Sequence, residues 1–251
     1  MKKIALLTAA GKGERFGGLM AKELYPLGSE DVNGKHLPKP ISRYMFDALR
    51  RIEPDIFYFV VHPTKPQLVY YYGNGRRFDT KVAYLVQEEP TSQYSAIEEI
   101  RYFMEKDDIV FYAMPDTVVE PGDIFITLHK KCRKEKADIT IGMFKVKHPQ
   151  FFTTVELDKN GNFLRAEIKP KQPKTNWIWG VLVFNYRFFE IADEIRNTTQ
   201  GVVGSDDIGA ILNGAKEKGA KISCHRFNRY RYYDFASYDK VLNYIRDDHS
   251  A

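Results

Sequence analysis

The first half of the chain alternates short apolar runs with amphipathic helical patterns, and this alternation narrows the choice of fold most strongly. Residues 4–8 form an apolar, β-rich run that passes directly into a glycine-rich turn. From Ile41 to Ile52, apolar residues recur at the spacing of one helix face. Such alternation is typical of right-handed βαβ units and a mostly parallel sheet. We therefore predict a single α/β domain.

The remaining elements follow from the same periodicities. Further strands are expected over residues 56–61, 81–86, 108–113, 138–146, 179–184 and 221–227. Residues 153–157 and 163–168 flank Asn160-Gly161, a sequence typical of a β-hairpin turn. Further helices are expected from a capping box at Ser95, after Pro121, over residues 187–195, over 206–218 with Ser205 as its cap and Gly219 at its end, and from Ser237. The hairpin adds antiparallel strands, so the predicted sheet is mixed.

Composition excludes several classes of protein. The chain has 251 residues, of which 43% are hydrophobic and 28% charged, and this balance excludes a disordered or fibrous protein. Cys132 and Cys224 stand alone, which argues against a disulfide framework or a zinc site. No apolar run approaches the ~20 residues of a membrane span, and the start does not resemble a signal peptide. We expect a cytoplasmic protein that does not bind membranes.

The net charge of +5 is compatible with a polyanionic partner such as nucleic acid, a nucleotide or a sugar phosphate. Because 38 basic residues face 33 acidic ones, most of these charges are expected to form an ordinary solvated surface.

The glycine-rich turn after the first strand spans residues 9–17. Small residues let backbone N–H groups approach an anion closely, as phosphate-binding turns require. A dinucleotide fingerprint would need glycine where Phe16 stands, and the GxxxxGK[ST] phosphate loop is absent. A tight turn without a ligand remains the plain alternative. Arg15 and Lys22 favour a triphosphate, because fixed cations beside backbone amides stabilise charge on phosphate.

These segments resemble the signature of the sugar-phosphate nucleotidyltransferases, which reads approximately A-G-G-x-G-T-R followed by K-x-L-x-P. The corresponding residues here are Ala9-Ala10-Gly11-Lys12-Gly13-Glu14-Arg15 and Lys22-Glu23-Leu24-Tyr25-Pro26. Ala10 and Glu14 depart from the signature. The resemblance covers scattered motifs up to about residue 245. It implies a Rossmann-like, GT-A-like domain with a mixed, mostly parallel sheet flanked by helices.

Two carboxylates are candidates for holding Mg²⁺, which phosphoryl chemistry requires near the reacting phosphates. Asp116 follows a predicted strand, at the sheet edge where ligands bind in open α/β folds. Asp234 resembles the aspartate of the family's W-x-D-x-G-T segment, although Ala236 replaces its glycine. An isolated aspartate is more often a cap or a loop carboxylate. The resemblance favours a metal role for both.

The resemblance also implies substrate contacts. Lys169 corresponds to the lysine of an E-K-P element that contacts the sugar phosphate, with Ile168 in place of the preceding glutamate. Asn176 and Gly180 correspond to a strand that lines the sugar pocket, and Gln87 to a residue that reads the nucleobase edge. The implied nucleotide-binding residues of the turn are Ala9, Ala10, Gly11 and Gly13.

The implied reaction converts an NTP and a sugar 1-phosphate to an NDP-sugar and pyrophosphate. Arg15 would stabilise the β- and γ-phosphates, and Lys22 the α-phosphate. Residues 1–120 would bind the nucleotide and residues 121–245 the sugar phosphate, without nucleic acid as a partner. The sequence leaves the base, the sugar and the oligomeric state open, although this family is often multimeric.

Three alternatives remain open at this point. A cytidylyltransferase acting on a non-sugar phosphate or phosphonate has a similar AAGxGxR loop, and Ala9-Ala10 favours it slightly. A dinucleotide-dependent oxidoreductase is more distant. A nucleic-acid-binding module could use the basic and aromatic run over residues 225–233, for which an edge strand near the phosphate site is the plainer interpretation. Residues 29–39 are either a lid or an insertion.

Overall fold

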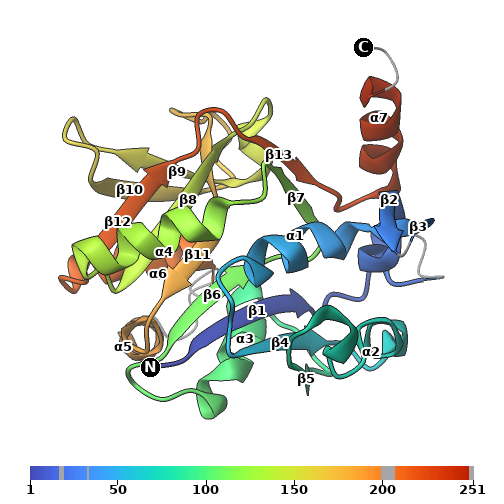
Figure 1. The fold of residues 1–251 in the computed structure, drawn as a ribbon. Helices are drawn as coiled ribbons and strands as arrows, with labels where there is room; N and C mark the ends of the chain where they lie inside the picture. Colours follow the sequence, from blue (N-terminus) through green and yellow to red (C-terminus); the bar gives the residue numbers. More distant parts are fainter. Residues whose placement is uncertain (17–19, 33, 199–206, 249–251) are drawn as a thin grey trace.

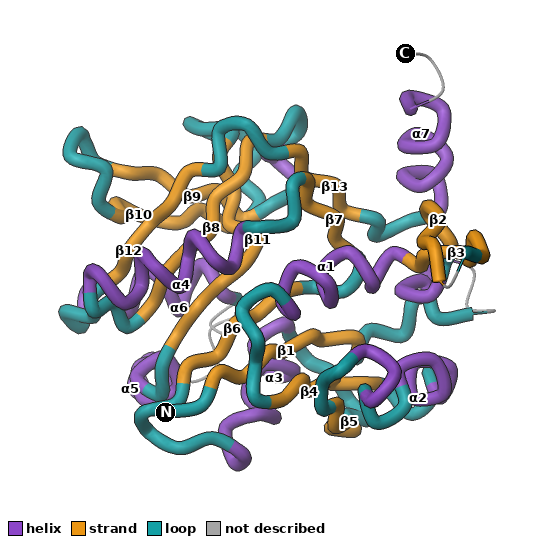
Figure 2. Tube along the Cα trace, in the orientation of Figure 1, coloured by secondary structure: helices purple, strands orange, loops and turns teal. Residues whose placement is uncertain are grey.

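The computed structural model describes residues 1–16, 20–32, 34–198 and 207–248, apart from the side chains at 15, 32, 247 and 248. A mixed, nine-stranded sheet runs through the molecule with helices on both faces (Figures 1 and 2). Its strands follow the order β10-β9-β11-β6-β1-β4-β5, and β8 pairs with both β11 and β12. The predicted α/β fold with helices on both sides of a mixed sheet is confirmed.

The first half of the chain supplies the parallel part of the sheet. It contains β1 (Lys3–Ala9), β4 (Ile56–Val61), β5 (Val82–Val86) and β6 (Ile109–Ala113). β1 lies between β4 and β6 and is parallel to both. Ile4, Ala5, Leu6 and Leu7 are fully buried, because helices cover both faces of this strand. The carboxyl ends of β1, β5 and β6 therefore share one edge of the sheet.

The second half adds mainly antiparallel strands. These are β8 (Ile139–Lys145), β9 (Thr153–Leu157), β10 (Phe163–Ile168), β11 (Trp177–Phe184) and β12 (Ile222–Arg226). β11 joins the two halves, since it pairs antiparallel with β6 on one side and with β8 on the other. The β9–β10 hairpin turns at Gly161, whose φ of 84° is a left-handed conformation that favours glycine. The predicted hairpin is confirmed.

Helices cover the two faces of the sheet. One face packs against α1 (Ile41–Arg50), α2 (Pro66–Tyr72) and α4 (Ile124–Glu135), and the other against α3 (Gln93–Glu98), α5 (Arg187–Thr198) and α6 (Ile208–Glu217). Short 3₁₀ turns are η1 (Glu14–Phe16), η2 (Lys22–Leu24), η3 (Arg76–Phe78), η4 (Glu99–Phe103) and η5 (Pro149–Phe151). In the described parts of the chain, no helix has the length and apolar character needed to cross a membrane.

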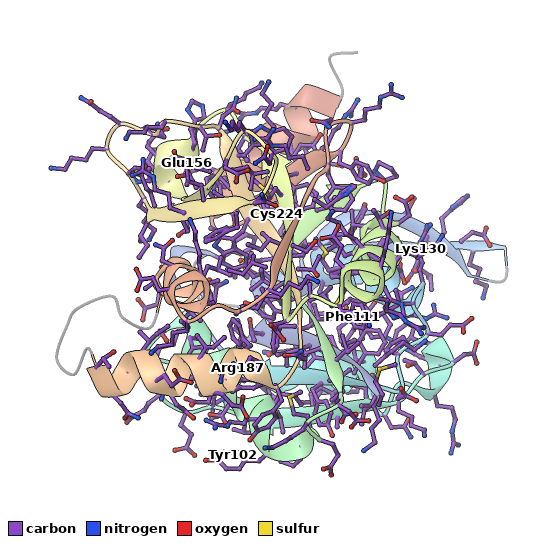
Figure 3. The ribbon with its side chains drawn as sticks, turned by 90° about the vertical axis from the view of Figure 1, so that its left-hand side faces the viewer. Tyr102, Phe111, Lys130, Glu156, Arg187 and Cys224 are labelled. Carbon is purple, nitrogen blue, oxygen red and sulfur yellow. The ribbon has the colours of Figure 1, made fainter. Side chains whose placement is uncertain are left out.

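Aromatic side chains fill much of the core, as their frequency predicts. Phe111 on β6 is fully buried and lies among interior side chains, whereas Tyr102 lies at the edge and is 87% exposed (Figure 3). Phe46 on α1 stacks on Phe57 of β4 with ring centroids 4.3 Å apart. Such contacts fix the helices against the sheet.

Two predicted helix starts differ from the structure. α3 begins at Gln93 and not at Ser95, because Ser92 is the N-cap: its hydroxyl accepts a hydrogen bond from the Ser95 N–H at 3.0 Å. The Ser95 hydroxyl accepts in return from the Ser92 N–H at 3.1 Å. Asp207 caps α6, and its carboxylate accepts from the Gly209 N–H at 2.7 Å. The predicted cap Ser205 lies outside the described residues.

Two small sheets were not predicted. β2 (Pro26–Val32) and β3 (Lys35–Pro40) form an antiparallel hairpin over the segment that the sequence left as a lid or an insertion. β7 (Thr117–Glu120) pairs antiparallel with β13 (Arg231–Asp234). α7 (Tyr238–Asp248) follows β13 and lies apart from the main sheet, close to β2 and β3 (Figure 1). The β7–β13 pairing brings the end of the chain to the carboxyl edge of β6.

Candidate active site

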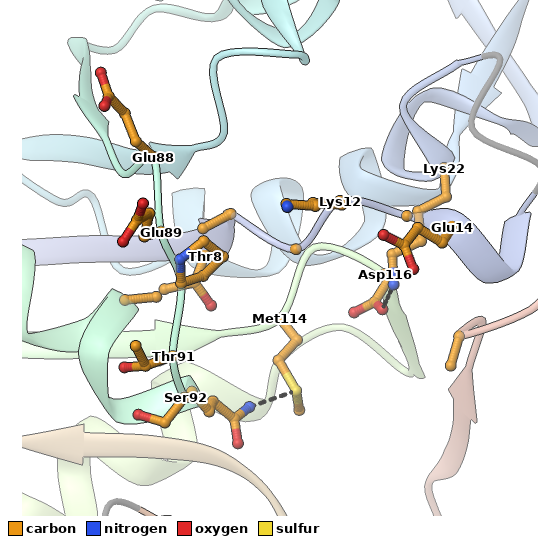
Figure 4. Close-up of a pocket in the computed structure, with 17 residues that line it drawn as sticks. Thr8, Lys12, Glu14, Lys22, Glu88, Glu89, Thr91, Ser92, Met114 and Asp116 are labelled. Atoms are coloured by element: carbon orange, nitrogen blue, oxygen red, sulfur yellow. Dashed lines mark hydrogen bonds and ion pairs between the residues drawn. The ribbon is translucent and has the colours of Figure 1, made fainter.

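A cavity of about 910 Å³ lies at the shared carboxyl edge of β1, β5 and β6 (Figure 4). It is lined by Thr8, Ala10, Gly11, Lys12, Gly13, Glu14, Lys22, Glu88, Glu89, Pro90, Thr91, Ser92, Gln93, Ala96, Met114, Asp116 and Ala236. Lys22 and Asp116 lie at one end, and Glu88 and Glu89 at the other (Figure 4). Open α/β sheets bind ligands at this edge.

The glycine-rich turn forms one wall of the cavity. Gly13 has a φ of 71°, and a Cβ built on Gly11 or Gly13 would meet no atom within 4 Å. The Phe16 N–H donates to the Gly13 carbonyl at 2.9 Å and so closes the turn into η1. Ala10 lines the cavity, whereas Ala9 is buried behind it. The turn can therefore bring its backbone close to an anion. The side chain of Arg15 lies outside the described part of the chain.

Lys22 and Asp116 form an ion pair at the end of the cavity (Figure 4). Lys22 begins η2, and Asp116 follows β6, so two segments separated by more than 90 positions meet here. Burial lowers the pKa of Lys22, but the charge and hydrogen bond of Asp116 raise it more, and the net direction is upward. Lys22 is therefore a cation at neutral pH, held at the wall of the cavity.

Asp234 lies close to Asp116 because β13 pairs with β7. Asp234 is in register with Thr117, and the Phe235 N–H donates to the Asp116 carbonyl at 2.9 Å. Burial, and next the charge of Asp116, raise the pKa of Asp234, while its ion pair with Lys240 opposes them. Two neighbouring carboxylates with mutual repulsion are the setting that a divalent cation relieves.

Asp116 and Asp234 have the oxygen donors that Mg²⁺ prefers, and their role as metal ligands stays a prediction. Among the described residues, no group of three or more His, Cys, Asp or Glu side chains could hold a metal by itself. Mg²⁺ bound in nucleotide sites usually takes one or two carboxylates, and phosphate oxygens and water complete its shell. Asp116 and Asp234 supply that number of ligands.

Asp234 does not line the 910 Å³ cavity; it borders another cavity, of about 620 Å³, at the ends of β8 and β13. Its other charged lining residues are Lys145, Lys147, Arg231 and Lys240. Asp234 is therefore the acidic residue among the basic residues that line the 620 Å³ cavity. Asp116 lines the 910 Å³ cavity, together with the glycine-rich turn.

The predicted base-reading residue Gln87 does not line the larger cavity. It is 7% exposed, and its Nε2 donates to Ser95 Oγ at 3.3 Å and to Glu99 Oε1 at 3.4 Å. Gln93 lines the cavity instead, and its Nε2 donates to the Tyr112 hydroxyl at 3.1 Å. Sequence reasoning missed Gln93, Glu88 and Glu89. Their position between the end of β5 and α3 was the signal that could have found them.

The three predicted sugar-phosphate residues lie outside the 910 Å³ cavity. Lys169 is exposed after β10, with a φ of 41°, and its N–H donates to the Phe152 carbonyl at 3.2 Å. The Asn176 carbonyl accepts from the Val146 N–H at 3.0 Å. Gly180 is buried within β11. The structure thus brings together the turn, Lys22, Asp116 and Asp234, and leaves these three apart from the cavity.

Gly180 leaves room for two aromatic rings. A Cβ there would lie 2.6 Å from both Phe144 Cδ2 and Tyr232 Cε2. We therefore expect Gly180→Ala to lower the free energy of unfolding by about 1–3 kcal/mol through overpacking. Chemical denaturation would measure this. Gly122→Ala is the control, because its Cβ would meet only Ala48 Cβ at an ordinary 3.8 Å. Equal stabilities of the two variants would contradict this packing role.

Comparisons with known proteins bear on the family of the chain. A family model described as nucleotidyl transferase matches residues 4–250. The glucose-1-phosphate thymidylyltransferase of Streptomyces griseus is 27% identical over 201 residues, covering 78% of this chain and 53% of that protein. The bifunctional protein GlmU of Methanocaldococcus jannaschii is 24% identical over 240 residues, covering 95% and 54%. The chain thus spans about half the length of these two relatives.

Solved structures share the fold. A Bacillus anthracis protein solved in complex with sucrose superimposes with a TM-score of 0.83 at 16% identity, covering 99% of this chain and 96% of that one. The UTP-bound UGPase of Acinetobacter baumannii gives a TM-score of 0.75 at 14% identity, covering 99% and 93%. The family match covers nearly the whole chain, residues 4–250, and includes the glycine-rich turn at the cavity. The chain belongs to the nucleotidyl transferase family.

Proposed function

We propose that the protein transfers a nucleotidyl group from an NTP to a sugar 1-phosphate, giving an NDP-sugar and pyrophosphate. The observation that carries this proposal is the Lys22–Asp116 pair at the end of a cavity walled by the glycine-rich turn. The relatives named glucose-1-phosphate thymidylyltransferase and GlmU support the substrate class.

The reaction would be a direct displacement. A phosphate oxygen of the sugar 1-phosphate attacks the α-phosphorus of the NTP, and the bond from that phosphorus to the bridging oxygen breaks. The electron pair leaves with pyrophosphate. No covalent intermediate with the protein is needed, because positioning and charge stabilisation suffice for such a transfer.

The residues at the cavity have separate roles in this proposal. Backbone N–H groups of the turn around Gly11 and Gly13 bind the triphosphate. Lys22 lies against the α-phosphate and stabilises the charge that grows on its equatorial oxygens. Arg15 contacts the leaving phosphates, and Lys169 orients the acceptor from the second half of the chain. Residues 1–120 then serve the nucleotide and residues 121–245 the sugar phosphate.

Asp116 and Asp234 would hold Mg²⁺ in this proposal. The bound ion supplies neutralisation of phosphate charge, which lowers the repulsion between donor and acceptor. Before the ion binds, Lys22 and Lys240 each compensate one of the two carboxylates. The two ammonium groups therefore offset part of the repulsion between the carboxylates.

A second candidate is a cytidylyltransferase that acts on a non-sugar phosphate or phosphonate. The Ala9-Ala10 pair favours it, as does the separation of Lys169, Asn176 and Gly180 from the larger cavity. The donor half of the mechanism is the same in both. The acceptor distinguishes the two candidates.

A pyrophosphate-release assay tests both candidates together. The protein, with Mg²⁺, would be incubated with each common NTP or dNTP against hexose 1-phosphates, amino-sugar 1-phosphates and non-sugar phosphates. We expect release that requires both a nucleotide and a sugar 1-phosphate. Release only with CTP and a non-sugar phosphate would support the second candidate. Absence of release with every pair would contradict both.

A further inference from the structure

A buried ion pair lies behind the wall of the cavity and does not line it. Glu23 and Lys65 are 2% and 3% exposed, and Lys65 Nζ donates to Glu23 Oε1 at 2.6 Å. The same Nζ donates to the Ala9 carbonyl at 3.0 Å. Charges buried to this degree are costly unless they are paired and hydrogen bonded.

The pair joins three segments that build the cavity. Ala9 is the last residue of β1 and the first residue of the glycine-rich turn. Glu23 is the central residue of η2, adjacent to Lys22. Lys65 is the N-cap residue of α2. The Lys65 ammonium group thus links two segments to the start of α2. One is the start of the glycine-rich turn, and the other is η2, which contains Lys22.

Residues 62–65 form the turn between β4 and α2. At the other end of this turn from Lys65, His62 contacts the cavity wall at Glu88. His62 is 9% exposed, and its Nε2 lies 3.1 Å from the Glu88 carbonyl. Its Nδ1 lies 2.8 Å from Thr64 Oγ1, and the Lys65 N–H donates to the His62 carbonyl at 2.9 Å. Glu88 lines the cavity at the end opposite Lys22 (Figure 4). Residues 62–65 therefore contact both ends of the site from behind.

We propose that residues 62–65, through Lys65–Glu23 and His62, are positioning residues that set the glycine-rich turn and Lys22 in register with the wall at Glu88. The proposal rests on the proposed nucleotidyl transfer. None of these side chains needs to touch substrate. Because the reacting groups must be held to within a fraction of an ångström, a shift of Lys22 by about 1 Å would cost roughly 10²-fold in rate.

Stability alone does not account for the charges of this pair. Glu23 Oε2 is buried and has no hydrogen-bond partner. Burial raises the pKa of Glu23 even though the Lys65 charge opposes it. An apolar pair of similar volume would fill this space without the desolvation cost. What an apolar pair could not supply is the hydrogen bond to the Ala9 carbonyl and the directed link to η2.

This difference separates a positioning role from a structural one. We would compare wild type with Lys65→Met, with Glu23→Leu, and with the double variant. Each single change leaves an uncompensated buried charge and should lower Tm strongly. The double variant should recover most of that Tm. The proposal predicts that its kcat/KM for NTP nevertheless stays at least about 10-fold below wild type, because displacement of Lys22 lowers kcat and displacement of the glycine-rich turn raises KM.

A remote ion pair, which is more exposed than Lys65–Glu23, gives the control. Arg101 Nη1 and Nη2 donate to the two carboxylate oxygens of Asp193 at 2.9 and 2.6 Å, between η4 and α5 and away from the cavity. The Arg101→Met, Asp193→Leu double variant should keep the wild-type kcat/KM. Recovery of both Tm and kcat/KM in the Lys65–Glu23 double variant would overturn the proposal.

Two further measurements keep the test decisive. If the apolar double variant does not fold, His62→Leu is tested in its place. For His62→Leu we expect the KM for NTP to rise at least about fivefold, and kcat to change less than KM. An unchanged KM would overturn the proposal. Nucleotide affinity from calorimetry gives the same comparison without turnover. Failure of the proposed function would instead appear as absent pyrophosphate release by the wild type.

Discussion

Replacing Lys22 by methionine is expected to lower kcat by about 10²–10³-fold, because a preorganised cation aimed at developing phosphate charge contributes most in the transition state. Lys22 is held by Asp116 at the end of the cavity, and the net direction of its pKa shift is upward. The side chain is therefore charged and oriented before substrate arrives. Methionine matches lysine as far as Cε and lacks the ammonium group, so the change removes the charge, its hydrogen bonds and the ion pair with Asp116.

Pyrophosphate release at saturating substrates measures this loss. Lys106→Met is the matched control, because the side chain of Lys106 is 84% exposed and lies away from the cavity. Circular dichroism would show that both variants keep the fold. A Lys22→Met protein that turns over within a fewfold of wild type would remove Lys22 from the mechanism.

Asp116→Asn should reduce kcat at least about 10²-fold and raise the Mg²⁺ concentration needed for half-maximal rate. The amide keeps the shape of the carboxylate but not its charge. It therefore weakens cation binding and releases Lys22 from its ion pair. The two effects act on the same phosphate, so we expect this loss to be the largest among the single variants of the site.

A magnesium titration of the rate distinguishes these effects from misfolding. Asp239→Asn is the control, since this aspartate is exposed on α7, five positions after Asp234. It should show the wild-type magnesium dependence. If Asp116→Asn showed an unchanged half-saturating concentration of Mg²⁺, the assignment of Asp116 as a metal ligand would be wrong.

Local signals in the sequence were sufficient for most of the sheet and for part of the site. β4 was predicted at its observed bounds, Ile56–Val61, because a continuous apolar run bounded by polar residues has few other solutions. The turn after β1 was predicted because its small residues follow a buried strand directly. Lys22 and Asp116 followed from their positions next to such elements, and the structure brings them together.

Features that depend on pairing between distant segments were not predictable in the same way. β7 and β13 have only four residues each, and neither shows a clear alternation that would predict its partner. Asp234 reaches Asp116 only through that pairing. Gln87 was predicted from the resemblance. In the structure Gln93 lines the cavity instead, because the Ser92 cap places Gln93 at the start of α3, a contact that local sequence does not reveal. The Lys65–Glu23 contact spans 42 positions and leaves no local pattern.

The most direct test of the central claim is a crystal structure of the protein with Mg²⁺ and a non-hydrolysable α,β-methylene NTP. We predict that the triphosphate lies along the backbone of Gly11 and Gly13, with its α-phosphorus beside Lys22 and the metal on Asp116 and Asp234. A nucleotide bound elsewhere, with this turn empty, would contradict the account.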